Sequence, residues 1–476
     1  MTVRSGLHER AFQHLRAQLF EGKLTPGQTI LASDMAASMS MSLTPVREAI
    51  QRLIGHGSLE AMPNGNARVR LFSEAQIDEW WLIRTLLESL ATARAAERAG
   101  QAPLADLLAI NTAAKEQLDA GNVLEFARLN RNFHFSLYAL AGSNVLSEII
   151  ENLWEKAGPY IVMAIPAYVQ AYASGKPKHL LDPHDEVYDA LLCGDGTAAA
   201  VALRRDIGMT VKWGNVPAAI KIQAVVREVR AIRPDFRLVG LTSSELENAA
   251  SRPDEFQRSH AVTRSASRVE RRQSEQSKAR KAIREALICG QYMPGEHLTV
   301  RQLSEGLNLG VVPVREALRE IGSIGPLEKL ENGRLRVRLF SGADGRDILE
   351  IQALLEAIAA ASAATLLKQS MLDRLKQLNE KTEKAMSAGE VSKTRLLVHA
   401  FVETICKTAN LEILFEVLEH VWVMAGPIMV HYWRQVDLDA VLKWQRAMVV
   451  ALADGDALGA ARVIASRDKA SGTFYA

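Results

Sequence analysis

The chain repeats itself, and this repeat limits its fold more than any other feature of the sequence. The segment 24–73 recurs at 292–341, an offset of 268 residues. Three shared strings carry most of the identity: Pro-Val-Arg-Glu-Ala at 45–49 and 313–317, Arg-Val-Arg-Leu-Phe-Ser at 68–73 and 336–341, and Ala-Gly-Pro at 157–159 and 425–427. Two long copies exclude a solenoid of short repeats and indicate a duplicated unit with more than one domain.

The composition is that of a globular protein with substantial cores. The 476 residues are 48% hydrophobic, 24% charged and 6% aromatic, which excludes a disordered chain, a collagen-like fibre and a disulfide miniprotein. Few aromatic residues and 13 methionines favour helix-rich cores. The net charge of +2 gives no overall cationic field, so any basic surface must be local.

Three features indicate a cytoplasmic location. Cys193, Cys289 and Cys406 are odd in number, lie far apart and form no CxxC pair, as expected in a reducing compartment. The N-terminal residues lack the apolar core of a signal peptide. We find no run of about 18 apolar residues and therefore expect no membrane span and no membrane partner.

Each copy divides into two parts with different patterns. Residues 5–73 hold short helical patterns that end at Gly and Pro, whereas 74–235 hold long amphipathic helical patterns. The second copy divides likewise into 276–341 and 342–476. Between the copies, 243–275 is rich in Ser, Arg, Glu and Gln, which predicts a solvated linker. The predicted fold class is therefore mainly α.

The first part of each copy has the pattern of a winged helix-turn-helix. A short helix at 32–37 and a polar break at 38–42 precede a second helix, for which Thr44 is the expected N-cap and Pro45 a first-turn residue. Such a second helix can lie in the major groove of DNA, with Arg47 on its exposed face. A β-hairpin is predicted after it from three segments: 59–62, the Asn64-Gly65 turn and 67–71.

These strings resemble the GntR family of bacterial transcription regulators. The resemblance rests on Leu-x-Pro-Gly at 24–27, Thr-Pro-Val-Arg-Glu-Ala at 44–49 and the Asn-Gly wing, and it covers nearly the whole chain, twice. The helical second part resembles the FCD effector domain of the fatty-acid-regulator-like branch. The resemblance implies a tandem fusion of two units, each a winged helix-turn-helix followed by an all-helical effector-binding bundle.

The recognition helices depart from the family string, which usually reads Ser-Arg-Thr-Pro-Val-Arg. Copy 1 has Leu43 in place of the first Arg, and copy 2 reads Gly-Val-Val-Pro-Val-Arg at 310–315. The retained arginine of each copy could read a guanine edge or hold a phosphate; the alternative is a solvated or ion-paired arginine. The implied DNA-contacting residues are Ser42, Thr44, Arg47, Arg52 and wing residue Arg68 in copy 1, and Arg301, Arg315, Arg319 and wing residue Arg334 in copy 2.

Copy 1 retains part of a metal site that the resemblance implies. Many family members bind a divalent metal through an Asp-x3-His pair and two later histidines, where copy 1 has Asn130, His134, His184 and Asp206. The spacing of four places the first two on one helical face. Two imidazoles and a carboxylate suit Zn, Ni or Mn. The alternatives are a satisfied polar core and a water-filled effector pocket without metal.

Copy 2 lacks these ligands, so we expect metal in copy 1 only and a degenerate second effector domain. An arginine that often meets an anionic effector in the family corresponds to Arg84 in copy 1 and to Gln352 in copy 2. Arg84 could instead pair with Glu88, four residues further on. The copy 2 equivalents of the metal ligands are Leu396 and Ala400, or Val398 and Val402 if a gap is placed later, followed by Gln445 and Arg467.

Together these features predict a DNA-binding transcriptional regulator that responds to a small-molecule effector, expected to be a carboxylate. The fused units are expected to form an internal pseudo-dimer, as a monomeric chain or a homodimer, on an operator that is an imperfect palindrome. The alternative is a ligand-sensing protein that has lost specific DNA binding and acts through a protein partner. A metal-dependent enzyme is disfavoured, and no enzyme activity is expected, because we find no nucleophile or phosphate-binding motif.

Overall fold

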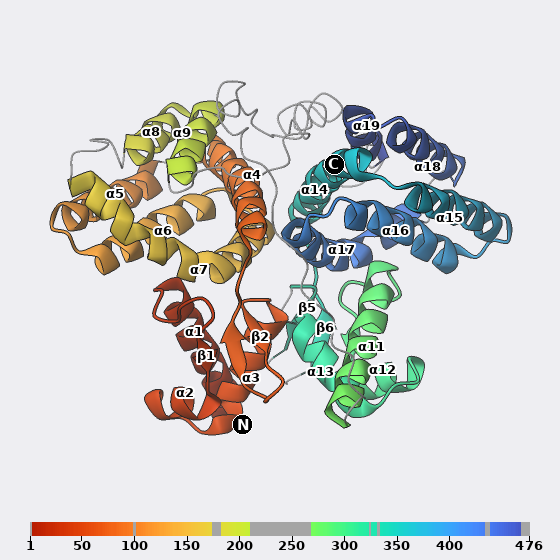
Figure 1. The fold of residues 1–476 in the computed structure, drawn as a ribbon, viewed down its shortest axis with the longest axis horizontal. Helices are drawn as coiled ribbons and strands as arrows, with labels where there is room; N and C mark the ends of the chain where they lie inside the picture. The colour runs from red at the N-terminus through yellow and green to blue at the C-terminus, as the bar shows by residue number, and fades with distance from the viewer. Residues whose placement is uncertain are drawn as a thin grey trace. The chain divides into compact units, whose positions relative to one another are not determined.

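The computed structural model describes residues 2–98, 101–173, 182–209, 268–322, 325–330, 334–433 and 438–467 (Figure 1). These residues form two compact units, which correspond to the two copies of the repeat. Each unit contains a small three-stranded sheet with three helices, followed by a bundle of helices. The predicted fold class, mainly α with two winged helix-turn-helix domains and two helical bundles, is confirmed.

The first winged helix-turn-helix, head 1, combines three helices with a small antiparallel sheet. Its sheet has the order β1-β3-β2, with Leu59 opposite Val69 and Ala61 opposite Ala67. Gly65 adopts φ +84° in the hairpin turn, a conformation that favours glycine, and the predicted wing is confirmed. The elements of head 1 are α1 (Thr2–Phe20), β1 (Thr29–Ile30), α2 (Ala32–Ser38), α3 (Leu43–Gly55), β2 (Leu59–Ala61) and β3 (Ala67–Val69).

The recognition helix α3 begins two residues earlier than the sequence pattern predicted. Its N-cap is Ser42 and its first residue is Leu43, so the expectation that Thr44 caps it was wrong. Pro45 therefore stands third in the helix, where its missing N–H is still one of the free donors of the first turn. The buried face of α3 includes Val46 and Leu53, and it packs into the core of head 1.

The long helix α4 is the centre of the first bundle. Every residue from Asp78 to Ala96 is buried, because α6, α7, α8 and α9 pack around this helix. Helix α7 crosses α1 at Gly158, where an added Cβ would lie 2.8 Å from the Leu19 carbonyl oxygen. The bundle consists of α4 (Glu74–Arg98), α5 (Gln101–Asp119), α6 (Val123–Ala139), α7 (Asn144–Ala173), α8 (Asp182–Cys193) and α9 (Gly196–Met209).

The second unit repeats this arrangement. Its sheet has the order β4-β6-β5, and Gly426 meets the backbone of α11 as Gly158 meets that of α1. This close approach of two helices explains why the Ala-Gly-Pro string is shared. Its elements are α11 (Arg268–Ile288), β4 (His297–Leu298), α12 (Val300–Gly306), α13 (Val311–Gly322), β5 (Leu327–Lys329) and β6 (Leu335–Val337) in head 2, then α14 (Gly342–Leu366), α15 (Gln369–Ser387), α16 (Val391–Thr408), α17 (Glu412–Trp433), α18 (Leu438–Ala453) and α19 (Ala457–Arg467) in the second bundle.

The segment between the copies is partly helical. Helix α11 begins at Arg268, inside the segment 243–275 that was expected to be a linker. The reason is that α11 is the counterpart of α1. Each of these helices precedes the first strand of its head in the sequence, and they have similar lengths. The rest of that segment, and residues 210–235 of the first effector domain, lie outside the described residues.

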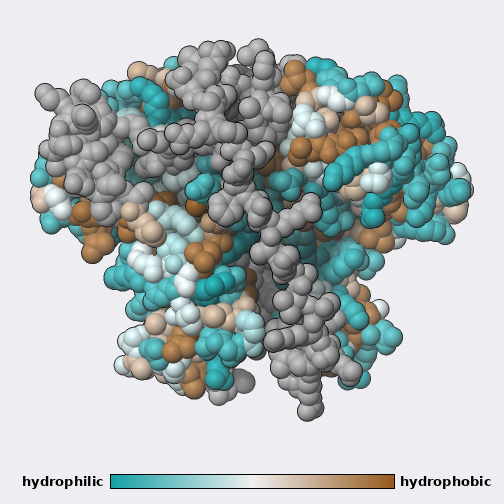
Figure 2. All heavy atoms as spheres, in the orientation of Figure 1, coloured by the Kyte–Doolittle hydropathy of each residue, from teal (hydrophilic) through white to brown (hydrophobic). Residues whose placement is uncertain are grey.

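Two helices of the second bundle are long and apolar enough to cross a membrane, which the sequence reading did not anticipate. They are Gly342–Leu366 and Glu412–Val430, and 94% and 72% of their most apolar windows are buried within the protein. Both helices therefore bury most of their apolar surface in the core of the bundle. The outer helix α15 is amphipathic, and the surface over it is mostly hydrophilic (Figure 2).

A buried carboxylate joins the first bundle to head 1. Glu155 of α7 accepts hydrogen bonds from His56 Nδ1 at 3.0 Å and from the Ser58 hydroxyl at 2.6 Å, and it pairs with Arg16 at 3.0 Å. In the second unit the equivalent residue is Val423, which is buried in the apolar core cluster of head 2. The same junction is therefore polar in one unit and apolar in the other.

The polar junction should make the first unit sensitive to acid. Burial by itself raises the pKa of Glu155, but the attraction of His56 and Arg16 outweighs it and lowers the pKa from 4.5 to about 2. A carboxyl group with a lowered folded-state pKa contributes stability above its unfolded pKa and loses it as pH falls towards the folded value. We expect the advantage of wild type over Glu155→Gln, about 3 kcal/mol at pH 7, to disappear between pH 4.5 and 2.

Urea unfolding followed by tryptophan fluorescence at several pH values measures this difference. Val423→Thr, at the equivalent apolar position, should show no such pH dependence. A stability difference between wild type and Glu155→Gln that stays constant down to pH 2 would contradict the assignment.

Candidate metal centre and DNA interface

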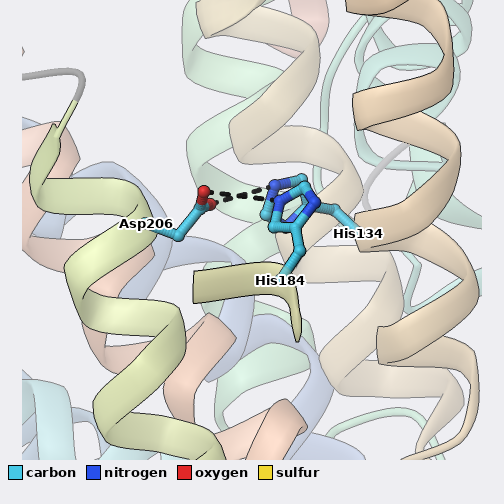
Figure 3. A group of neighbouring side chains, drawn as sticks. All are labelled: His134, His184 and Asp206. Atoms are coloured by element: carbon cyan, nitrogen blue, oxygen red, sulfur yellow. Dashed lines mark ion pairs between the residues drawn. The ribbon is translucent and has the colours of Figure 1, made fainter. Parts of the chain in front are cut away.

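Three side chains converge in the core of the first bundle. His134 of α6 and His184 of α8 both turn their rings toward the Asp206 carboxylate of α9 (Figure 3). The two Nε2 atoms lie 3.2 and 3.3 Å from the carboxylate oxygens, and all three side chains are buried. Among the described residues this is the one group of three His, Cys, Asp or Glu side chains placed to hold a metal ion.

Outer hydrogen bonds assign the proton on each histidine ring. His184 Nδ1 lies 3.1 Å from Asn111 Oδ1, and the amide nitrogen of Asn111 donates to Asp185. His134 Nδ1 lies 3.1 Å from the Tyr138 hydroxyl. Burial raises the pKa of Tyr138 well above its usual value, so this hydroxyl keeps its proton, which it donates to Glu88, and it accepts from His134. Both Nδ1 atoms therefore carry a hydrogen, which leaves the lone pair on each Nε2.

This arrangement fits a divalent cation. Burial lowers the pKa of His184, which keeps that ring neutral, and its Nε2 makes no hydrogen bond. Two lone pairs and an ionised carboxylate facing one point repel each other unless a cation lies between them. The N₂O donor set suits the Zn, Ni or Mn expected from sequence.

The fourth expected ligand, Asn130, lies one helical turn before His134 and is half-buried. Its role as a ligand stays a prediction. Asn111 and Tyr138 were not identified from sequence. Tyr138 could have been found, because it follows His134 by four residues, but Asn111 lies on α5 and no sequence pattern connects it to His184.

Arg84 is fully occupied within the first bundle. Its Nη2 donates to Glu88 at 3.0 Å, and its guanidinium lies 4.2 Å from the centre of the Trp154 ring. Glu88 also accepts from the Trp154 indole nitrogen at 2.9 Å and from Tyr138. The structure thus contains the Arg84–Glu88 ion pair, which the sequence offered as the alternative to an effector contact of Arg84. The effector contact of Arg84 stays a prediction, and Glu88 and Tyr138 connect it to His134.

Backbone landmarks settle the alignment of the second bundle. Gly142 and Asn410 both adopt positive φ, as do Gly121 and Gly389, each pair at the offset of 268 residues. No gap separates these landmarks, so Val398 and Val402, not Leu396 and Ala400, are the equivalents of Asn130 and His134. Gly194 and Gly455 also share positive φ, which equates Gln445 with His184 and Arg467 with Asp206.

In the second bundle the side chain of an arginine, Arg467, lies at the position equivalent to Asp206. Arg467 forms an ion pair with the fully buried Glu356 at 2.7 Å. Glu356 also accepts from the indole of Trp422 at 2.7 Å and from the Gln352 amide at 2.9 Å. The carboxylate that both copies share therefore has its counter-ion at the position of Arg84 in the first bundle and at the position of Asp206 in the second. In the second bundle an arginine of the last described helix thus neutralises Glu356.

The predicted DNA-contacting residues of head 1 separate into two groups. Ser42, Thr44 and Arg47 are exposed at the start of α3, and the Ser42 side chain makes no capping hydrogen bond. Arg52 instead pairs with Glu9 of α1 at 2.9 Å, and its guanidinium covers the Phe12 ring. Arg68 pairs across the wing with Glu60 at 2.7 Å. The exposed group lies together at the N-terminal end of the recognition helix.

Head 2 has the same exposed arginine. Arg315 of α13 is exposed at the position equivalent to Arg47. Arg301 of α12 pairs with Glu305 at 2.8 Å but is 88% exposed, and Arg334 is exposed in the wing. Arg319 lies on α13, with its side chain outside the described residues. Arg47 and Arg315 are thus the two basic residues that both heads present alike.

The comparisons with known proteins agree with this architecture. The family described as "Bacterial regulatory proteins, gntR family" matches residues 7–69 and 275–337, and the FCD domain matches 79–208 and 347–467. The chain belongs to the GntR family. It is a DNA-binding transcriptional regulator built as a tandem of two units, each with a GntR head and an FCD bundle.

Relatives of this GntR tandem regulator include two proteins of Escherichia coli (strain K12). The HTH-type transcriptional regulator McbR is 33% identical over 145 residues, 30% of this chain and 66% of McbR. The HTH-type transcriptional repressor RspR is 24% identical over 201 residues, 42% of this chain and 86% of RspR. The solved structure of E. coli McbR/YncC is 27% identical, covers 43% of this chain and 94% of its own, and has a TM-score of 0.40.

The geometry of the histidine site predicts one metal ion per chain. Replacing both imidazoles, in His134→Ala with His184→Ala, should reduce bound Zn²⁺ from one equivalent to none, because a lone buried carboxylate is a poor ligand set. Gln445→Ala, at the position equivalent to His184, is the matched control and should retain one equivalent. Equilibrium dialysis followed by elemental analysis measures both. Two equivalents in wild type, or one in the double variant, would contradict a single site in the first bundle.

Proposed function

We propose that the chain binds one operator with both heads, as an internal pseudo-dimer in which only the first unit senses an effector. The observation that carries this proposal is the exposure of Arg47 and Arg315 at the same position of two recognition helices. An arginine there can donate two hydrogen bonds to a guanine edge. Because the surrounding residues of the two helices differ, the operator is an imperfect palindrome.

Sensing is assigned to the first bundle because that bundle holds two imidazoles and a carboxylate that face one another. His134, His184 and Asp206 would hold a divalent ion, which supplies positive charge and open coordination positions for an anionic ligand. Arg84 lies in the same hydrogen-bonded network, through Glu88, and provides a guanidinium for a carboxylate. A small carboxylate is therefore the proposed effector. Its binding would shift the population of head arrangements and so change the affinity for DNA.

A second candidate function is ligand sensing through a protein partner without specific DNA binding. It is favoured by the recognition helix of head 2, which lacks the Ser and Thr of head 1 at positions 310 and 312. A gel-shift titration with the DNA upstream of the gene separates the two. Binding no tighter than to unrelated DNA would favour the partner-based function.

If both heads read DNA, each exposed arginine should be needed on its own half-site. Arg47→Ala and Arg315→Ala should each weaken operator binding by about 1–3 kcal/mol, the range for a lost bidentate base contact. Footprinting should show lost protection on opposite half-sites in the two variants. Arg128→Ala is the control, because Arg128 lies on α6 of the bundle, where it pairs with Glu125. An unchanged footprint for Arg315→Ala would show that head 2 does not read DNA.

The pseudo-dimer has a definite mass. If the two units of one chain provide both heads for an operator, the free protein should be a monomer of 52.3 kDa. It should also bind a two-half-site duplex with a stoichiometry of one. Light scattering on the free protein and on the complex measures both values. A mass of twice the chain would support a homodimer with four heads instead.

A further inference from the structure

The recognition helix of head 2 presents two valines that its core does not use. Val311 is 47% exposed and Val312 is 57% exposed, whereas the buried face of α13 includes Val314, Ala317 and Leu318. Valine is a weaker helix former than most residues, because its branched side chain loses rotamer freedom. Neither packing nor helix stability therefore accounts for two exposed valines in the first turn.

The valines lie on the DNA-reading side of the helix. They precede Arg315 by four and three residues, and residues with this spacing are neighbours on a helix surface. Arg315 is exposed, as is Arg47 at the equivalent position of head 1. In helix-turn-helix domains the N-terminal residues of the second helix contact the base edges. Val311 and Val312 thus stand where sequence is read.

The two heads offer different chemistry at this turn. Head 1 has the exposed hydroxyls of Ser42 and Thr44, which donate and accept hydrogen bonds. Gly310 and Val312 hold these positions in head 2, so the side chains of the turn make no hydrogen bond to a base. The apolar group that a base edge offers in the major groove is the 5-methyl group of thymine. A valine in a helix holds its methyl groups in one preferred rotamer, which suits such a contact.

We propose that Val311 and Val312 contact thymine methyl groups, so that head 2 selects thymine in its half-site. In head 1 the exposed Leu43 stands at the position of Val311 and the hydroxyl of Thr44 at the position of Val312. This inference rests on the proposed function, because it requires that head 2 bind DNA. It assigns the asymmetry of the operator to one turn of each recognition helix.

The test uses a duplex selected from a random pool by the purified full chain. The loss of protection in Arg315→Ala identifies the half-site that head 2 occupies. Each thymine of this half-site is then replaced by deoxyuridine, which removes the methyl group and keeps every hydrogen-bonding group of the base. Affinity should fall about fourfold for each contacted methyl, the factor that corresponds to one methyl-sized group leaving an apolar contact.

The variant Val311→Ser with Val312→Ser completes the cycle. It should bind the thymine duplex as weakly as wild type binds the deoxyuridine duplex, and it should no longer respond to the replacement. Val391→Ser is the matched control, because Val391 is an equally exposed valine at the first position of helix α16.

The outcomes separate the two claims. Equal affinity of wild type for the thymine and deoxyuridine duplexes would overturn the inference and leave DNA binding intact. A valine variant that keeps its full response to deoxyuridine would also overturn it. Failure to select any duplex would overturn the proposed function, and the inference with it.

Discussion

A buried carboxylate in the central helix of each bundle is the interaction on which the rest of the structure depends. Glu88 and Glu356 are both fully buried, and each accepts a hydrogen bond from an indole, that of Trp154 or Trp422. A carboxylate removed from water costs several kcal/mol unless charge and hydrogen bonds compensate for it. The duplicated bundles share this requirement, and the residues that meet it differ between them.

The position of the counter-ion differs between the two bundles. In the first bundle Arg84 neutralises Glu88 from the same helix, which leaves Asp206 of α9 free to face two histidines. In the second bundle Arg467 of α19 neutralises Glu356. This ion pair joins α19 to the central helix α14. The first bundle therefore keeps two histidines and a carboxylate that face one another, whereas the second neutralises its central carboxylate with Arg467.

Short-range patterns explain which parts were predictable from sequence. The Asn64-Gly65 turn predicted the wing, and the spacing of four predicted Arg84 with Glu88, because both depend on neighbouring residues. The partner of Arg52 was not predictable, since Glu9 lies on another helix 43 residues away. The same holds for Asn111 and His184, which meet only in the packed bundle. Such partners are far apart in the sequence and meet only in the folded chain. The spacing of residues in a single sequence therefore does not predict them.

The junction with the head follows from the same carboxylate. Trp154 and Glu155 are successive residues of α7: the first donates to Glu88, and the second holds His56, Ser58 and Arg16 of the head. In the second unit Trp422 keeps its bond to Glu356, but Val423 meets the head through apolar contacts that have no direction. Hydrogen bonds and an ion pair thus join α7 to head 1, whereas apolar contacts of Val423 join α17 to head 2. The two units thus differ in their junctions as well as in the partners of the central carboxylate.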